Sequence, residues 1–297
     1  MICLPQSVEE EELLHNIREI SWNVSRILKS YSENNENNNQ FKRKLQINYS
    51  ETGPITLADT EISEYIKSAI NQKYNLINWE FLSEEDKKYN KNRKFESKWV
   101  WIIDPLDGTK DFINKTGEYA MHLALTYQKK IILGIVLIPS KNELWLFLKG
   151  RGTWCEKQDF SENLLIKNNF KDISEITVLT SRTHVTNEFR FLLEKLNPKK
   201  IIGMGSIGYK VTSILRGDGD LYISYAIPGG SCPKDWDIAS PLSLIEGAGG
   251  YFTDINGRSL NFLKDENYDQ RGILISSINS NHKEICKTIS NIVKNIN

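Results

Sequence analysis

The sequence predicts a protein of mixed α and β structure that is organised in two halves. Its 297 residues exceed the size of a typical single domain. Helical periodicity is followed by long apolar, strand-like runs in the first half, whereas short strands alternate with helical stretches in the second half. These three observations together favour a two-domain fold with both helices and sheets.

The first half begins with two helical patterns. Ser7 and Glu10 have the spacing of a capping box, and apolar residues then recur every three or four positions from Leu13 to Tyr31. A second helix is expected from about Asp59, with isoleucines on one face. The Asn-rich stretch 34–39 that separates the two helices has the composition of a loop.

Strands are expected in the rest of the first half and throughout the second. The segment 99–103 predicts a buried strand that ends at Asp104-Pro105, and the polar segment 84–98 before it predicts a loop. Gly150-Arg-Gly152 is the place where we expect the chain to enter the second half. The other expected elements are a hairpin of 131–138 and 143–148, strands at 176–180, 221–224 and 272–276, a helix closed by Gly249-Gly250, and a last helix at 281–293.

Composition excludes several classes of function. The 38 basic and 38 acidic residues give a formal net charge of zero, so no global field attracts nucleic acid or an anionic membrane. The four cysteines form no C-x-x-C pair, which favours reduced thiols in a cytosol. The acidic N-terminal segment is unlike a secretory signal, and the longest apolar run is too short to span a bilayer. We expect a soluble, cytoplasmic protein without a nucleic-acid or membrane partner.

The most informative motif is Asp104-Pro-Leu-Asp-Gly-Thr-Lys-Asp-Phe112, which follows the apolar strand. Asp104 and Asp107 lie on either side of a turn, so both carboxylates and the Leu106 carbonyl between them could converge on a hard cation such as Mg²⁺. Gly108 and Thr109 then offer backbone N–H groups to an anion. Such a layout suits a phosphate ester. The alternative is an ordinary surface turn, since these residue types favour turns.

The same motif resembles the signature of the inositol monophosphatase superfamily of Mg²⁺-dependent, lithium-sensitive phosphatases, and is most like its 3'(2'),5'-bisphosphate nucleotidase branch. Four other segments are similar to family motifs in the expected order: 53–59, 82–85, 205–210 and 236–250. The resemblance covers roughly residues 50 to 276. Departures at Ser240-Pro241 and Gly247 lie beyond the expected metal ligand Asp237, on the helix that follows it.

The resemblance implies a two-domain, layered α/β/α/β/α sugar-phosphatase fold. An N-terminal α+β domain (1–150) would carry most metal ligands, and a C-terminal α/β domain (151–297) would contribute Asp237 and substrate contacts. Two or three Mg²⁺ ions are implied, with the ligands Glu84, Asp104, Leu106 (through its carbonyl), Asp107 and Asp237. The implied catalytic residues are Asp59, Thr109 and Glu84. The implied substrate contacts are Leu106, Asp107, Gly108, Thr109, Ser206, Lys210 and Asp237.

Each of these residues also has a simpler interpretation. Glu84 alone would be a solvated charge, and Asp59 and Asp237 alone would be helix caps. The four histidines (His15, His122, His184, His282) lie outside every motif, so a nucleophilic histidine or cysteine mechanism has no support. Only the joint occurrence of the carboxylates favours the catalytic interpretation.

Three functions remain open from the sequence. Lys110-Asp111-Phe112 favours a nucleotidase that converts adenosine 3',5'-bisphosphate to AMP and phosphate in sulfur metabolism. An inositol monophosphatase or another sugar-phosphate phosphatase, including a fructose-1,6-bisphosphatase, would use the same residues. An inactive phosphate-binding module is the third, although no expected ligand is missing. The resemblance is compatible with either a monomer or a homodimer.

Overall fold

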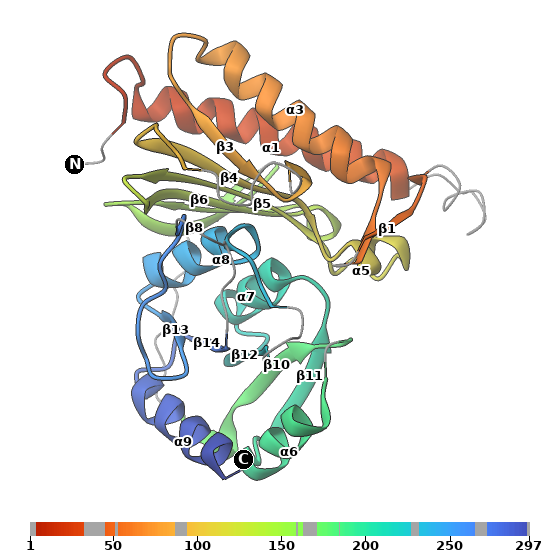
Figure 1. Cartoon of the computed structure of the whole chain (residues 1–297), viewed down its shortest axis with the longest axis vertical. Helices are drawn as coiled ribbons and strands as arrows, with labels where there is room; N and C mark the ends of the chain where they lie inside the picture. The colour runs from red at the N-terminus through yellow and green to blue at the C-terminus, as the bar shows by residue number, and fades with distance from the viewer. Residues whose placement is uncertain are drawn as a thin grey trace.

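The computed structural model describes residues 4–32, 45–50, 53–86, 94–158, 160–162, 171–183, 185–226, 232–264 and 272–295. Helices and sheets alternate along its long axis in five layers, α/β/α/β/α (Figure 1). The layered fold expected from the sequence is therefore confirmed. The Asn-rich stretch 34–39 lies outside the described residues.

The outermost layer consists of α1 (Glu10–Ser32) and α3 (Leu57–Lys73), which cover one face of the larger sheet (Figure 1). The apolar stripe of α1 is buried as expected, with Leu13, Ile17 and Val24 fully inaccessible. The expected capping box at Ser7 is wrong. The chain around Ser7 forms a turn closed by the bond from the Val8 N–H to the Pro5 carbonyl (2.9 Å), and α1 starts only after it.

The larger sheet has seven strands in the order β3-β4-β5-β6-β7-β8-β9, and all neighbours are antiparallel except β3 and β4. The expected hairpin of 131–138 and 143–148 is confirmed. The boundary expected after residue 150 falls between two strands of this one sheet. Its strands are β3 (Glu80–Ser83), β4 (Trp99–Asp107), β5 (Ala120–Tyr127), β6 (Lys130–Ile138), β7 (Glu143–Leu148), β8 (Gly152–Lys157) and β9 (Phe160–Glu162).

Two helices, α7 (Ile207–Arg216) and α8 (Asp235–Gly247), lie between the larger sheet and a smaller one (Figure 1). The smaller sheet has the order β11-β10-β12-β14-β13. Its strands are β10 (Thr177–Ser181), β11 (Lys200–Met204), β12 (Leu221–Tyr225), β13 (Tyr251–Asp254) and β14 (Ile273–Ser277). The outer face is covered by α6 (Asn187–Leu196) and α9 (His282–Lys294). The strands and the last helix expected in this half are confirmed.

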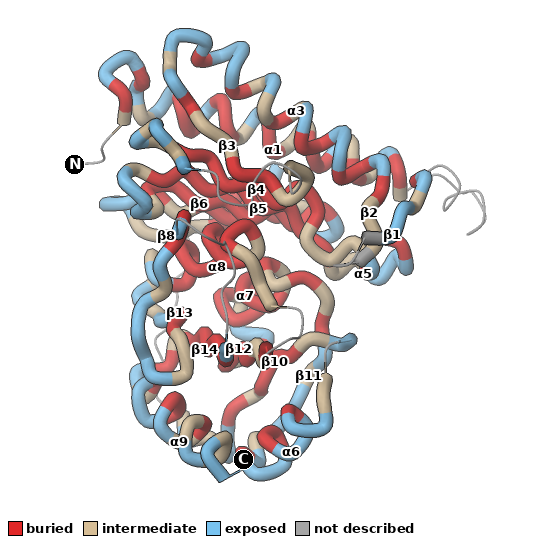
Figure 2. Tube along the Cα trace, viewed as in Figure 1, coloured by how far each residue is buried: buried red, intermediate tan, exposed pale blue. Residues whose placement is uncertain are grey.

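Short elements complete the fold. They are the hairpin of β1 (Asn48–Ser50) and β2 (Gly53–Ile55), the helix α5 (Thr109–Ile113), and the 3-10 turns η1 (Glu84–Asp86), η2 (Pro139–Lys141) and η3 (Ile173–Glu175). Most of both sheets and of the helices between them is buried, whereas exposed residues lie on the outer helices, the loops and the edge strand β11 (Figure 2). Within the described ranges, no helix has the length and apolar character that crossing a bilayer demands.

Strand β4 continues through the Asp-Pro motif, although the sequence suggested that it would end at Asp104. Its pairing with β5 shifts register between Asp104 and Asp107, because Pro105 has no N–H to donate to the ladder. This irregularity turns the two carboxylates toward the middle layer, where α7 and α8 begin. The strand thereby brings its acidic end against the second half of the chain.

Candidate active site

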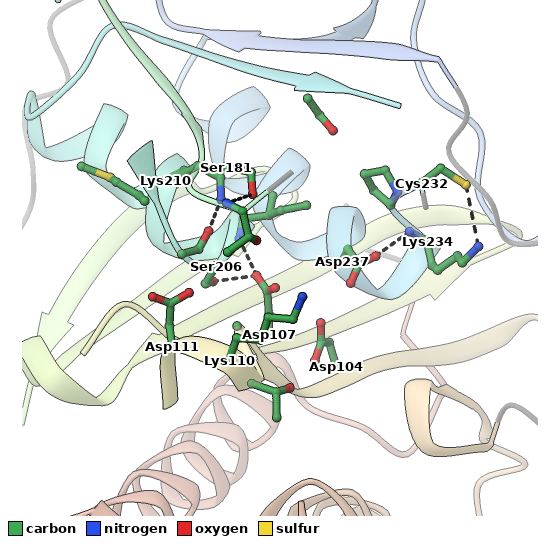
Figure 3. Close-up of a pocket in the computed structure, with 18 of the residues that line it drawn as sticks. Asp104, Asp107, Lys110, Asp111, Ser181, Ser206, Lys210, Cys232, Lys234 and Asp237 are labelled. Atoms are coloured by element: carbon green, nitrogen blue, oxygen red, sulfur yellow. Dashed lines mark hydrogen bonds between the residues drawn. The ribbon is translucent and has the colours of Figure 1, made fainter. Parts of the chain in front are cut away.

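A cavity of approximately 240 Å³ lies where the end of β4 meets α5, α7, α8 and β12 (Figure 3). Its walls include every metal ligand expected from the sequence: Glu84, Asp104, Leu106, Asp107 and Asp237. The expected substrate contacts Gly108, Thr109, Ser206 and Lys210 also line it. Asp59 is not among the lining residues; it lies behind Thr109. Residues from both halves of the chain thus meet in one cavity.

Local hydrogen bonds shape the turn at the end of β4. The Leu106 N–H donates to Asp104 Oδ1 (3.1 Å), and the Thr109 hydroxyl donates to the Leu106 carbonyl (3.1 Å). Gly108 has φ +87°, and a Cβ there would lie 3.1 Å from the Glu118 carbonyl oxygen, so any other residue would be strained at this position. Because Asp104 and Leu106 are fully buried, the alternative of an ordinary surface turn does not hold.

Asp59 is both a helix cap and a neighbour of the cavity. Its Oδ2 accepts hydrogen bonds from the backbone N–H (2.7 Å) and the hydroxyl (2.5 Å) of Thr56, which closes a capping box at the start of α3. Its other oxygen, Oδ1, lies 3.4 Å from the Thr109 hydroxyl. Burial, reinforced by repulsion from Glu84, raises the pKa of Asp59 to about 7.

Asp104 and Asp237 form an acidic cluster deep in the cavity. Burial raises the pKa of both carboxyl groups well above the ordinary range, and repulsion from Glu84 and Asp107 adds to this effect. Asp104 Oδ2 has no hydrogen-bond partner in the described part of the chain. Asp237 accepts from the Lys234 N–H (2.5 Å) as the third residue of α8, so it also stabilises a helix start.

This donor set fits a divalent cation. Buried carboxylates that repel one another are costly unless a positive charge compensates them, and the unpartnered oxygen of Asp104 is available as a ligand. Carboxylate and carbonyl oxygens are the ligands that hard cations such as Mg²⁺ prefer. The chemistry of the residues present therefore agrees with the metal that the sequence implied.

Asp107 connects the cavity to α7. Its Oδ2 accepts a hydrogen bond from the Ser206 hydroxyl (2.6 Å; Figure 3). The same oxygen also accepts from the Ile207 N–H (2.5 Å) and the Gly208 N–H (3.2 Å). One turn further along α7, the ammonium group of Lys210 donates to the Gly205 carbonyl. Burial lowers the pKa of Lys210 to about 8.

His122 is a site residue that sequence reasoning missed. It pairs directly with Asp104 across β4 and β5. Its Nε2 lies 3.4 Å from Asp107 Oδ2, and its Nδ1 lies 3.9 Å from Asp104 Oδ2. Burial lowers its pKa, which favours the neutral imidazole. Within the described ranges, these two aspartates and His122 are close enough to hold a metal ion together. Only the pairing of β4 with β5 could have revealed this neighbour.

Basic side chains and aromatic rings also line the cavity. Lys110 and Lys234 line it together with Lys210. Phe189 and Tyr225, which also line it, stack with ring centroids 5.3 Å apart. The cavity therefore combines an acidic region that suits metal ions with basic side chains that suit a phosphorylated ligand.

Comparison with known families agrees with this geometry. The model of the inositol monophosphatase family matches residues 9–294. The chain belongs to this family. Membership confirms the resemblance found in the sequence and identifies the protein as a phosphatase of a metal-dependent family. The acidic cavity described above is accordingly the candidate active site.

The individual relatives described next share no more than 27% of their residues with this chain. The chain is 27% identical over 230 residues to the 3'(2'),5'-bisphosphate nucleotidase CysQ of Escherichia coli O6:H1, covering 77% of this chain and 88% of CysQ. It is 25% identical to a fructose-1,6-bisphosphatase/inositol-1-monophosphatase of Thermotoga maritima, covering 66% and 70% of the two chains. A solved Thermotoga maritima IMPase matches with a TM-score of 0.74 at 21% identity, covering 96% and 100%. This last likeness shows the shared fold.

Proposed function

We propose that the protein is a Mg²⁺-dependent phosphomonoesterase that removes the 3'-phosphate of adenosine 3',5'-bisphosphate, yielding AMP and phosphate. The observation that carries this proposal is the convergence of Asp104, Asp107 and Asp237 in one cavity beside the backbone of Gly108 and Thr109. The resemblance to a bisphosphate nucleotidase supports the choice of substrate.

Two or three Mg²⁺ ions would be held by the residues expected from the sequence: Glu84, Asp104, the Leu106 carbonyl, Asp107 and Asp237. Bound metal would lower the pKa of a coordinated water and neutralise the charge on the leaving oxygen. The protein contributes the arrangement of these ligands. Asp104 is fixed by the Leu106 N–H, Asp107 by Ser206 and the start of α7, and Asp237 by the Lys234 N–H.

Asp59 and Thr109 would move the proton of the attacking water. The Thr109 hydroxyl lies between Asp59 Oδ1 (3.4 Å) and the Leu106 carbonyl (3.1 Å). A base works best when its pKa is close to the working pH, and burial brings that of Asp59 to about 7. Water would give its proton to the Thr109 oxygen as the hydroxyl proton passes to Asp59. Glu84 would be a ligand of the metal ion on the side of the site where this water attacks.

The lysines of the cavity support a substrate with two phosphate groups. The backbone N–H groups of Gly108 and Thr109 would bind the phosphate that is cleaved, while Ser206 and Lys210 approach from α7. Lys110 and Lys234 also line the cavity. A second phosphate on the leaving nucleotide would pair with these two side chains.

The main competing function is hydrolysis of a sugar phosphate, which the name of the Thermotoga maritima relative supports. The inactive module is disfavoured because every expected ligand lines the cavity. From the family resemblance we also infer inhibition by submillimolar to millimolar lithium, a cytoplasmic place in sulfur metabolism, and a monomer or homodimer.

The decisive experiment compares phosphate release from adenosine 3',5'-bisphosphate, inositol 1-phosphate and fructose 1,6-bisphosphate, each with Mg²⁺ and with EDTA. We expect Mg²⁺-dependent release with the highest kcat/KM for the nucleotide. A strong preference for either sugar phosphate would overturn the substrate, and full activity in EDTA would overturn the metal mechanism.

A further inference from the structure

Two segments from opposite halves of the chain interlock at the edge of the cavity. One segment consists of α5, which contains Asp111, and the turn from α5 to β5, which contains Glu118; the other segment is the turn that joins β11 to α7 and contains Gly205 and Ser206. The Glu118 carboxylate accepts from the Gly205 N–H (2.8 Å), and the Glu118 carbonyl accepts from the Ser206 N–H (3.0 Å). A side chain at Gly205 would overlap both Asp111 and Glu118.

Arg182 connects these two segments from a third, directly after β10. Its guanidinium donates to the carboxylates of Asp111 and Glu118 and also to the Gly203 carbonyl (3.5 Å). Both carboxylates belong to the first half of the chain, whereas Arg182 and Gly203 belong to the second. We call the group of Arg182, Asp111 and Glu118 the clasp.

The clasp lies next to the start of α7, which holds Asp107. Ser206 is the N-cap of α7: its hydroxyl accepts from the Tyr209 N–H (3.1 Å) and donates to Asp107 (2.6 Å). The Ser206 N–H is the one that Glu118 binds. Asp111 and Lys210 are visible on the same side of the cavity in Figure 3. A shift of this turn would move the partners of Asp107 and the ammonium group of Lys210 together.

We propose that Arg182 and Glu118 are positioning residues, which hold the first turn of α7 against Asp107 and so fix the orientation of an expected metal ligand from the other half of the chain. Neither residue lines the cavity, so neither acts on the substrate directly. This inference rests on the proposed function only for its effect on catalysis; the positioning itself is a property of the metal-free protein.

The charges explain why an arginine is needed here. Without it, Asp111 and Glu118 would bring two carboxylates together beside the start of α7. A planar guanidinium can bind both at once, whereas a lysine offers a single charged point. Since the Arg182 side chain is 41% exposed, its ion pairs contribute little to global stability. Its main effect is therefore expected in the local order of α7.

The test uses Arg182→Met, Arg182→Lys and Glu118→Gln in the full chain. The matched control is Arg18→Met. It removes another bidentate ion pair, in which Arg18 of α1 binds the Glu156 carboxylate of β8 (2.8–3.0 Å). Hydrogen exchange of the segment 203–210 is measured first, in EDTA and without substrate. We expect faster exchange in Arg182→Met, a smaller increase in Arg182→Lys and Glu118→Gln, and none in Arg18→Met.

Kinetics then test the consequence for the site. Loss of a residue that orients a metal ligand typically weakens metal affinity or activity by 10–100-fold, so we expect about a tenfold higher Mg²⁺ concentration at half-maximal activity in Arg182→Met. Arg182→Lys should recover part of this loss. Unchanged exchange at 203–210 in Arg182→Met, or equal changes in Arg18→Met, would overturn the inference. A wild-type protein that releases no phosphate would overturn the proposed function, while the exchange data would still decide the role of the clasp.

Discussion

Each of the two sheets carries a buried polar cluster, and the two clusters differ in their hydrogen bonding. At the smaller sheet, His282 of α9 bonds to Thr253 of β13 (2.9 Å) through Nε2 and to Ser277 of β14 (2.8 Å) through Nδ1. In the larger sheet, Asp104 Oδ2 and His122 Nε2 lack hydrogen-bond partners among the described residues. The first cluster is complete in itself, whereas the second has ligand atoms left over.

This difference suggests a structural role for the His282 cluster and a functional role for the Asp104 cluster. A buried polar group without a partner costs folding free energy, so a fold retains it only where something else compensates that cost. The His282 cluster stabilises the packing of α9 on the smaller sheet. We expect the Asp104 cluster to destabilise the metal-free protein, because burial and mutual repulsion both disfavour its charged carboxylates. We therefore expect substitutions in the first cluster to change stability and those in the second to change activity.

The largest effect is expected from Asp237→Asn. The amide keeps an oxygen for the Lys234 N–H but removes the negative charge that metal binding requires. Since a catalytic metal supplies several kcal/mol of transition-state stabilisation, the rate of phosphate release should fall at least about 10³-fold. In EDTA, the melting temperature should stay the same or rise because one repulsive charge is gone. Initial rates and thermal unfolding measure the two quantities.

The control for this variant is Ser277→Ala in the other cluster. It removes one hydrogen bond to His282 and should lower the free energy of unfolding by about 1 kcal/mol without changing kcat. Wild-type activity in Asp237→Asn would show that the metal site is assigned wrongly. A large loss of activity in Ser277→Ala would show that the two clusters are not distinct.

A matched pair of substitutions sharpens the comparison further. Thr109→Val and Thr253→Val replace the same hydroxyl by a methyl group in the two clusters. Thr109→Val breaks the link between Asp59 and the attacking water, so kcat should fall about 10²-fold with little change in stability. Thr253→Val leaves His282 Nε2 unpaired and should cost about 2 kcal/mol of stability at unchanged kcat. Steady-state kinetics and urea unfolding of both variants measure the two quantities. A loss of stability in Thr109→Val with unchanged kcat, or a loss of kcat in Thr253→Val, would contradict the prediction.

The parts of this site that the sequence predicted are mainly local. Asp104 and Asp107 lie three positions apart after an apolar run, so their convergence follows from the chain itself. Asp237 lies far along the chain and was placed only through the family resemblance. His122 was missed because its contact with Asp104 depends on the pairing of β4 with β5. The clasp was missed for the same reason, since Arg182 follows a strand of the smaller sheet and Glu118 precedes a strand of the larger one.

For the fold as well, the features predicted correctly from the sequence are local ones. The stripe of α1 and the hairpin of β6 and β7 depend on local periodicity and are confirmed. Ser7 fitted a capping pattern, but the turn at Pro5 competes for the same residues. The domain boundary after residue 150 stays a prediction. The extension of the larger sheet to Glu162 favours a boundary after β9, because strand pairing decides where one sheet ends.

The smallest effect that we expect is a pH dependence of the stability that Mg²⁺ binding adds to the protein. The pKa of Asp59 is raised to about 7, and those of Asp104 and Asp237 are raised well above the ordinary range, so the metal-free protein retains protons near pH 6.5. A raised pKa in the folded state stabilises the protein below the unfolded pKa of about 4, and this contribution is lost as the pH rises through the folded value.

The pKa of His282 is lowered to about 4, and that of His122 is also lowered. These two groups therefore make the free energy of unfolding rise with pH, but only below the ordinary histidine pKa of about 6.5. Between pH 6.5 and 8 the carboxyl groups should therefore dominate. In EDTA the melting temperature should fall over this range, and Mg²⁺ should restore it because metal binding displaces the protons. Each displaced proton would strengthen Mg²⁺ binding about tenfold per pH unit. Calorimetric titrations in buffers of different ionisation enthalpy would count these protons, and a count of zero at pH 6.5 would remove the distinction between the two clusters.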